Sequence, residues 1–540
     1  MYESGTATDY LDLLERLDTF LTATGSAYGR AAGAGNTGNG GFGATLKGGS
    51  ASVAETWTVT LTSASAFTVV GSVSGAQGGT RTVGTAFVSD TPANRLAFTL
   101  TAGGVAFVAG DVFTFSTAPP WTSKLKARGC TVLASAGTSG QYAADNVVDG
   151  KVARDDPRQW QFLRAALPVT IEFTLAAAET VVEYAILGDQ SYGPNAWTLE
   201  YHNGSTWVTL DTRSGVTSWA DALIAYTVAS PVSATRYRLN ITAVNGAYTY
   251  GEVHAVELRR APGGPNAAYS QYLWMAPGND GTSEVYVGVH ALRRTDVDYY
   301  DWEMLACDGY TAGLNARQQP GKQGFLWMPL WNSSIPYWFV CDGRRVVVVV
   351  KVSTNYEACY LGLYDPFFTP AQLPYPICLG GALAIPSSSF NWNSTLLKWS
   401  TVNDGHNLFP HSDRNYSVGF DVPANYYQMR LRSLAGAWIG AAAKAQGSRD
   451  WAPRASEAIL WPECGDYSLL DVNHDGGYAL LPILMLAGEP NPMGQLSGVF
   501  AVTGQNAGAE DTVTVGGVTH LLVPNVNRTT RQDWLALRLD

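Results

Sequence analysis

Residues 182–210 read VEYAILGDQSYGPNAWTLEYHNGSTWVTL, and this stretch decides the fold of the middle of the chain. Apolar side chains recur at every second position on both sides of a Gly-Pro break. These positions are Val182, Tyr184, Ile186, Trp197, Leu199 and Tyr201. Because alternate residues of a strand point to one face of a sheet, the pattern predicts two strands with a buried face. Asn203-Gly204, shortly before Trp207, predicts a hairpin turn.

Further motifs surround this stretch in a fixed order. They are ADNVVDG at 144–150, Trp160, IEF at 171–173, PNAW at 194–197, WVTL at 207–210, RYRL at 236–239 and YGEV at 250–253. Together they resemble the discoidin family, the coagulation-factor type C or galactose-binding-like β-sandwich. The resemblance implies a jelly-roll sandwich over residues 121–262. Trp160, Trp197 and Trp207 lie inside strand patterns and are expected in its core. It also implies that loops at one end bind sugars or other surface ligands.

The composition favours a multi-domain, mainly β protein. At 540 residues the chain is longer than one hydrophobic core usually serves, and its Gly, Pro and aromatic content is typical of short strands joined by tight turns. With 15% charged and 46% hydrophobic residues, the chain is globular rather than disordered. A net charge of -11 without a basic cluster argues against nucleic acid as a partner.

Neither membrane insertion nor a disulfide framework is expected. The start of the chain is acidic and lacks the apolar segment of a secretory signal, and the apolar run at 479–487 is too short for a membrane helix. The 6 cysteines lack CxxC spacing, which favours buried free thiols. One disulfide, between Cys341 and Cys359, stays open as an alternative.

The chain divides by pattern into five regions. They are a helix at 1–24, a Gly-rich linker at 25–50, a small all-β domain at 51–120, the sandwich at 121–262 and a C-terminal β-rich part at 263–540. The helix, at 8–22, has one wide apolar face and Thr8 as its cap. Such a face must be buried, either on its own domain or, as a docking helix, against a neighbouring subunit.

Two features are predicted within the C-terminal part. The valine run at 346–350 is typical of a strand buried on both faces. A second helix is predicted over 426–445.

Segments outside the sandwich resemble another group of proteins. They are FTVVGSVSG at 67–75, GDVFTF at 110–115, GTSEVYVG at 281–288, WNSSIPYWF at 331–339, GRR at 343–345, YLG at 360–362 and QDWLALRL at 532–539. They resemble virion proteins of tailed bacteriophages, at the tail tip, baseplate or fibre. This implies a virion protein assembled in the host cytoplasm, with other tail proteins as partners and a homo-oligomeric state.

Aromatic residues in the expected sandwich loops are the candidate glycan contacts, because Trp and Tyr offer flat apolar faces to sugar rings. The candidates are Tyr192, Trp219, Tyr248 and Tyr250, with Asp189 and Asn245 for hydrogen bonds. Packing of the loops is the alternative role for these rings.

The discoidin resemblance also implies a structural calcium, held by the Asp149-Gly150 loop and Glu252. The chain departs from the family just after this loop, at Val152-Ala153-Arg154, and a plain Asx turn is the alternative. No other cofactor is expected.

Three further groups carry weaker signals. The loop at 471–476 fits half of a calcium motif but has Pro482 where a carboxylate is due, and a polar turn explains it better. Carboxylates crowd 296–303, at Asp296, Asp298, Asp301 and Glu303, and could supply a pair for glycoside hydrolysis. A cluster this dense in the sequence is more typical of a solvated turn. His406 and His411 lack the spacing of a helical zinc site.

The sequence therefore predicts a non-enzymatic virion protein that recognises a host cell-surface glycan. Two alternatives remain open: a glycan-degrading tail enzyme that the sandwich targets to its substrate, and a structural adaptor whose sandwich has lost its ligand.

Overall fold

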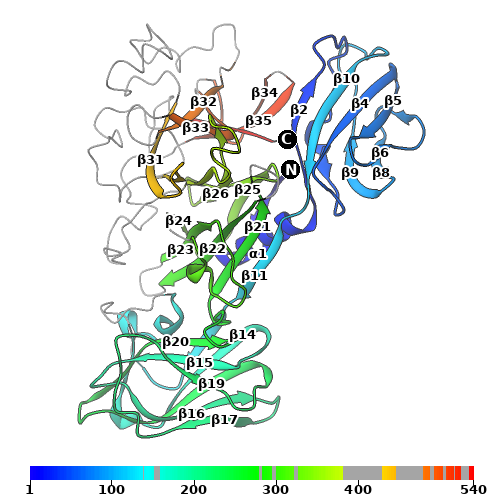
Figure 1. Cartoon of the computed structure of the whole chain (residues 1–540). Coiled ribbons are helices and arrows are strands. Elements are labelled where there is room, and N and C mark those ends of the chain that lie inside the picture. The colour runs from blue at the N-terminus through cyan, green and yellow to red at the C-terminus, as the bar shows by residue number, and fades with distance from the viewer. Residues whose placement is uncertain are drawn as a thin grey trace, which may run out of the picture.

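The computed structural model describes residues 1–137, 139–150, 159–278, 283–294, 299–321, 326–380, 429–445, 478, 480–486, 492–502, 506–515, 517–524 and 534–539. In this part of the chain the protein is a mainly β, multi-sheet structure with one α-helix, as the composition predicts. The described strands pair in antiparallel fashion. Three units result: a central body, an N-terminal module and a sandwich (Figure 1).

The central body combines both ends of the chain. Its helix is α1 (Tyr10–Ala23), and its strands are β1 (Tyr2–Ala7), β11 (Thr122–Arg128), β21 (Ser270–Pro277), β22 (Glu284–Arg294), β23 (Tyr299–Cys307), β24 (Leu326–Leu330), β25 (Ile335–Cys341), β26 (Arg345–Val352), β27 (Asn355–Leu363), β28 (Asp365–Pro366), β29 (Ile377–Gly380), β30 (Met429–Arg432), β31 (Trp438–Ala445), β32 (Leu481–Leu486), β33 (Pro492–Val502), β34 (Thr512–Val515), β35 (Val518–Pro524) and β36 (Trp534–Arg538). One sheet has the order β11-β21-β22-β23-β24, and the second begins β1-β25-β26-β27. Two strands of the body therefore come from regions that the sequence assigns elsewhere. β1 falls in the expected helix region at 1–24, and β11 falls in the expected sandwich at 121–262.

Helix α1 is buried inside this body. Asp9, rather than the expected Thr8, caps the helix, because its carboxylate accepts hydrogen bonds from two backbone N–H groups of the first turn. The apolar face of α1 packs in one core with β21 to β24 and with β25 to β27. The interpretation of residues 1–24 as a docking helix is therefore wrong, and packing on its own domain is what the structure shows. None of the helices among the described residues has the length and hydropathy of a membrane span.

Two features of the body test the sequence directly. The valine run forms β26 and is buried on both faces, with Val346, Val348 and Val350 in one core and Val347 and Val349 in another. Over 429–445, however, the chain forms β30 and β31, which pair as a hairpin, so the predicted helix is wrong there. Residues 426–428 lie outside the described part.

The cysteines agree with the reading as free thiols. Within the described part of the chain Cys130, Cys341, Cys359 and Cys378 form no disulfide, so none joins Cys341 to Cys359. These two lie on β25 and β27, which are separated by β26.

The N-terminal module is a small pair of sheets with a phenylalanine-rich core. Its strands are β2 (Ser26–Ala32), β3 (Lys47–Gly48), β4 (Glu55–Ser63), β5 (Ala66–Gly71), β6 (Gly75–Ala76), β7 (Arg81–Thr82), β8 (Ala86–Asp90), β9 (Ala93–Thr99) and β10 (Val112–Ala118), with a short 3-10 helix η1 (Gly43–Thr45). Residues 25–50 are not a linker, because β2 pairs with β10 along the edge of the larger sheet. The module therefore begins earlier than the sequence indicates.

The sandwich consists of two antiparallel sheets with a shared core. Its elements are β12 (Cys130–Ala134), η2 (Gly140–Tyr142), η3 (Ala144–Val148), β13 (Trp160–Leu163), η4 (Arg164–Ala166), β14 (Val169–Thr180), β15 (Glu183–Gly188), β16 (Pro194–His202), β17 (Trp207–Arg213), β18 (Ile224–Thr227), β19 (Ser233–Val244) and β20 (Tyr250–Arg259). The sheets have the orders β12-β14-β19-β16-β17 and β13-β20-β15-β18. The predicted hairpin is confirmed, since β16 and β17 pair across residues 203–206.

Both modules are inserted into the body. The sandwich lies between β11 and β21, which are neighbours in one sheet of the body, and the N-terminal module lies between α1 and β11. Because β11 belongs to the body, the sandwich begins after Arg128 and not at residue 121. Figure 1 shows the sandwich at one end of the molecule and the N-terminal module to the side of the body.

Candidate functional site

The candidate glycan residues gather at one end of the sandwich, which we call the loop end. It is formed by residues 189–193 between β15 and β16, and by residues 245–249 between β19 and β20. Gly193 N donates to the Asp189 carbonyl at 2.7 Å and closes the first loop. Asn245 N donates to the Gly193 carbonyl at 2.9 Å and joins the two loops, and Glu252 N on β20 donates to the Tyr192 carbonyl at 3.0 Å. The loops are therefore braced against each other before any ligand arrives.

Tyrosine rings make the exposed surface of the loop end. Tyr192 and Tyr248 are in contact, with ring centroids 4.6 Å apart and planes at 42°. Tyr248 is 50% exposed and Tyr250 is 38% exposed. Leu163, which pairs with Tyr250 across β13 and β20, is also exposed. An apolar, partly aromatic face is thus open to solvent.

Trp219 is not part of this exposed face. Its side chain is 3% exposed and packs beside Trp197, with centroids 5.9 Å apart, while its indole N–H donates to the Pro194 carbonyl at 3.2 Å. A Cβ on Gly193 would lie 2.5 Å from the indole nitrogen, so only glycine allows this close approach. The prediction that Trp219 contacts a glycan is corrected: it supports the loop from beneath.

The two polar candidates are largely engaged within the protein. Asp189 Oδ1 accepts hydrogen bonds from Ser191 N at 2.7 Å and Tyr192 N at 3.1 Å, which holds the turn at the start of the loop. Asn245 is buried, and its side-chain oxygen accepts from Asn195 Nδ2 at 2.9 Å. Asn245 therefore braces the loop end, whereas Asp189 keeps one carboxylate oxygen available.

The two predicted calcium ligands, Asp149 and Glu252, lie in different surroundings. Asp149 is buried where the sandwich meets the body and interacts electrostatically with Arg293 and Arg317. Glu252 instead lies with Asp189 and His254, and their potential ligand atoms are all within 4.8 Å of one another. Asp149 does not belong to this group, and residues 152–154 lie outside the described part of the chain.

Of the carboxylate cluster at 296–303, the structure describes Asp301 and Glu303 on β23. Both are buried, which contradicts the expected solvated turn. Burial opposes ionisation of Glu303, yet the Arg317 guanidinium, at 2.6 Å from both carboxylate oxygens, lowers the pKa of Glu303 to about 2. Burial raises the pKa of Asp301. Asp296, Asp298, His406, His411 and residues 471–476 lie outside the described residues.

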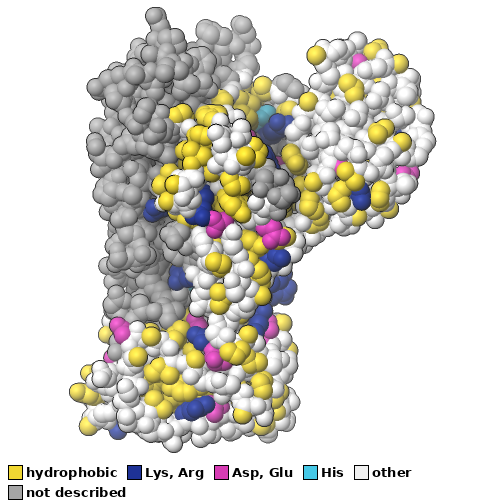
Figure 2. Space-filling model, in the orientation of Figure 1, with side chains coloured by type: hydrophobic (Ala, Val, Ile, Leu, Met, Phe, Trp, Pro, Cys, Tyr) yellow, Lys and Arg dark blue, Asp and Glu magenta, His cyan; other side chains and the backbone are white. Residues whose placement is uncertain are grey.

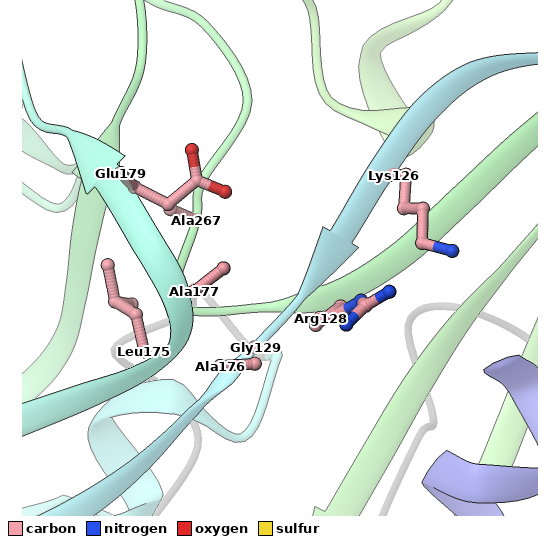
Figure 3. A pocket seen from close by; sticks show the side chains of 8 residues that line it. All are labelled: Lys126, Arg128, Gly129, Leu175, Ala176, Ala177, Glu179 and Ala267. Carbon is pink, nitrogen blue, oxygen red and sulfur yellow. The ribbon is translucent and has the colours of Figure 1, made fainter. Parts of the chain in front are cut away.

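A cavity of about 250 Å³ lies at the opposite end of β14 from the loop end (Figure 3). It is lined by Lys126, Arg128, Gly129, Leu175, Ala176, Ala177, Glu179 and Ala267. Its cations already have partners, since Lys126 pairs with Glu15 at 3.2 Å and Arg128 pairs with Glu15 at 2.9 Å. This cavity lies where β11 of the body meets β14 of the sandwich, and none of the candidate glycan residues lines it.

Comparison with known proteins finds likeness in solved structures alone. No protein-family model matches the chain, and no curated protein is similar to it. The chain is similar to the family 32 carbohydrate-binding module of Streptococcus pneumoniae EndoD, with 18% identity, a TM-score of 0.22 and coverage of 26% of this chain and 100% of that chain. The family 32 module from C. perfringens NanJ, in complex with galactose, shows 16% identity, a TM-score of 0.21 and coverage of 25% and 96%.

A third similar structure is chitosan-binding module 2 of a chitosanase/glucanase from Paenibacillus sp. IK-5, in complex with chitotriose. It shows 19% identity, a TM-score of 0.20 and coverage of 24% of this chain and 95% of that chain. At these values the likeness carries no argument about the ligand of this chain. The assignment as a sandwich rests on the strand pairing described above.

Sequence reasoning did not find His254 at this site, nor Gln161, whose Nε2 donates to Glu252 Oε1 at 2.7 Å. The signal was present in the alternation of β20, because Tyr250, Glu252 and His254 share one face of that strand. The register that places Gln161 opposite Glu252 depends on pairing with β13, which is remote in sequence.

Proposed function

We propose that the sandwich is a carbohydrate-recognition module that binds a sugar ring at its loop end. The observation that carries this proposal is the exposed tyrosine face, with Tyr248 50% exposed in the 245–249 loop and Tyr250 38% exposed at the start of β20. Backbone hydrogen bonds hold both segments to the 189–193 loop. Aromatic rings pack against the apolar faces of sugar rings, and a rigid site loses little conformational entropy on binding. Asp189 supplies a hydrogen-bond acceptor beside these rings.

For the whole chain we propose a non-enzymatic, oligomeric virion protein of a tailed phage, in the baseplate or tail tip, that binds a host-surface glycan. The support is the resemblance of segments in the N-terminal module and the body to tailed-phage virion proteins, together with the insertion of both modules into one body. Several copies on one particle would multiply a weak single-site affinity without new contacts.

The experiment is glycan-array binding by the purified full-length protein, compared with Tyr248→Ala and Tyr250→Ala. Loss of aromatic packing is expected to weaken binding of the recognised glycan by about fivefold for each variant, since a ring contact contributes roughly 1 kcal/mol. Leu133→Ala is the matched control, because Leu133 is exposed on β12, outside the loop end. This control should bind as the wild type does.

Two results would replace the proposal. If the wild type binds no glycan on the array, the adaptor alternative is favoured, with the tyrosine face as a protein contact. If incubation with the recognised glycan releases oligosaccharides, the protein is an enzyme and the non-enzymatic reading is wrong.

A further inference from the structure

One face of β13 and β20 carries a continuous row of side chains that ends in a polar cluster. Cross-strand partners project to the same face, so Leu163 lies beside Tyr250 and Gln161 beside Glu252. Gln159 directly precedes β13, whose pairing with β20 begins at Trp160 and Val253. The exposed apolar end of this row therefore leads directly into buried polar residues.

Asp189, at the end of β15, joins this row from the other side of β20. Potential ligand atoms of Asp189, Glu252 and His254 all lie within 4.8 Å of one another. Glu252 is 9% exposed and His254 is 7% exposed. Among the described residues no Lys or Arg forms an ion pair with Asp189 or Glu252. Two carboxylates held this close and partly out of water repel each other, and a bound cation would offset that cost.

Each carboxylate is oriented by a hydrogen bond to only one of its oxygens. Gln161 Nε2 donates to Glu252 Oε1 at 2.7 Å, and backbone N–H groups of the turn donate to Asp189 Oδ1 at 2.7 and 3.1 Å. Within the described residues no hydrogen bond reaches Glu252 Oε2 or Asp189 Oδ2. Carboxylates that bind metals are held in this way, with one oxygen fixed by an outer partner and the other directed at the ion.

An independent observation comes from Gln159. This residue is 8% exposed, and its side-chain oxygen is buried without a hydrogen-bond partner. Gln159 and Gln161 flank Trp160, whose ring lies in the core, so alternation directs the Gln159 side chain to the face that carries Gln161 and Glu252. A buried carbonyl-type oxygen without a donor is costly, and a metal ion or its bound water would satisfy it.

We propose that Asp189, Glu252 and His254 bind one divalent metal ion of the Zn²⁺ or Mn²⁺ type. A bound Zn²⁺ takes imidazole nitrogen and carboxylate oxygen at about 2.0–2.2 Å, which places its ligand atoms roughly 3–4 Å apart, so small side-chain movements close this site. Ca²⁺ requires about six to eight oxygen ligands, and an imidazole does not suit it. The donor set therefore differs from the calcium loop expected around Asp149.

The metal would fix the loop end in place. Asp189 begins the loop that carries Tyr192, and Glu252 lies on β20, where its backbone N–H already bonds to the Tyr192 carbonyl at 3.0 Å. A shared ion would connect that loop to β20 and so position the Tyr192 and Tyr248 rings. Metal binding itself does not depend on the proposed glycan function.

The test uses full-length protein treated with EDTA and then dialysed against Zn²⁺, Mn²⁺ or Ca²⁺ alone, with bound metal measured by elemental analysis. One Zn²⁺ or Mn²⁺ per chain is expected, with Ca²⁺ bound at least about tenfold more weakly. Glu252→Gln and His254→Gln should each remove this site. Gln161→Leu, which removes only the orienting hydrogen bond, should weaken affinity by about tenfold or more.

The control is Asp90→Asn, which removes a carboxylate on the N-terminal module that pairs with Arg81. It should bind metal as the wild type does. Circular dichroism in EDTA shows whether each variant is folded. If Glu252→Gln or His254→Gln does not fold, Gln161→Leu still tests the site. The proposal is overturned if wild-type protein binds neither Zn²⁺ nor Mn²⁺, if folded Glu252→Gln keeps the wild-type affinity, or if Ca²⁺ binds more tightly than both.

Discussion

At the scale of single residues, two tryptophans of the sandwich show how position in the sheet decides their role. Trp219 lies beneath the loop end, packed on Trp197 and against Gly188 and Gly193. Trp207 lies on the edge strand β17 and is only partly buried; the Arg238 guanidinium is 4.4 Å from its ring centroid. The expectation that Trp207 belongs to the core is therefore wrong, and its ring is held by cation–π contact instead.

Trp219→Ala should destabilise the sandwich by about 3–5 kcal/mol, because it empties a buried ring site under two glycines that cannot fill the space. Urea unfolding followed by circular dichroism measures this change. Trp207→Ala is the matched comparison and should cost clearly less. If both variants lose the same free energy of unfolding, the difference in burial between Trp219 and Trp207 does not affect stability.

At the scale of elements, α1 connects the two sheets of the body. The Trp302 indole N–H donates to the Tyr10 carbonyl at 3.0 Å, and the Trp274 indole N–H donates to Asp18 Oδ1 at 2.8 Å. Lys126 on β11 also pairs with Asp18, and Tyr272 hydrogen bonds to Glu15. The polar face of the helix is thus bonded to one sheet while its apolar face fills the core between the sheets.

Leu17→Ala should lower the stability of the body by about 2–5 kcal/mol, since Leu17 is fully buried in the shared core. Thr19→Ala, on the exposed side of the same helix, should change stability by less than about 0.5 kcal/mol. Thermal unfolding of both variants measures the difference. If the Leu17→Ala protein is as stable as the wild type, the packing of α1 in the core of the body is contradicted and a docking role is favoured.

At the scale of the whole molecule, charged side chains concentrate where the body meets the sandwich (Figure 2). In the sandwich, Arg259 pairs with Glu183 at 2.6 Å and with Glu257 at 2.7 Å. In the body, Arg317 pairs with Glu303 and also donates to the Gly150 carbonyl of the sandwich at 3.2 Å. This junction is buried and polar, so it depends on the ionisation of its carboxylates.

The Glu303–Arg317 pair should make this junction sensitive to acid. Because the folded-state pKa of Glu303 is about 2, below its ordinary value of 4.5, the pair stabilises the fold above about pH 4.5. That stability is lost as the pH falls from 4.5 toward 2. Glu303→Gln should lower the free energy of unfolding by about 3 kcal/mol at pH 7. On acidification the variant should then lose less stability than the wild type does. Thermal unfolding of wild type and variant across pH 7 to 3 measures both.

Glu172→Gln is the control for this experiment, because Glu172 pairs with Arg236 on an outer strand face away from the junction. It should keep most of the wild-type acid dependence. A Glu303→Gln protein that loses stability with acid as steeply as the wild type would contradict the assignment to this pair.

The sequence alone determined the local elements. Alternation around Tyr184 and Trp197, the turn at 203–206, the apolar face of α1 and the double-sided burial of 346–350 all follow from residue patterns within a few positions. The gathering of Asp189, Tyr192, Asn245, Tyr248 and Tyr250 also follows, because these residues lie in or directly beside loops that neighbouring strands of a sandwich bring together. Local periodicity is encoded within each segment, so it can be interpreted without knowledge of the fold.

Only the tertiary structure decided which segments meet. It pairs β1 with β25, buries α1 between two sheets and inserts both modules into one body, so the domain limits at 24, 50, 121 and 262 shift. It also buries Trp219, places Asp149 at the junction and sets His254 beside Asp189. The physical reason is that these contacts join residues hundreds of positions apart, such as Asp18 and Trp274, and no local pattern specifies which remote surface completes a core.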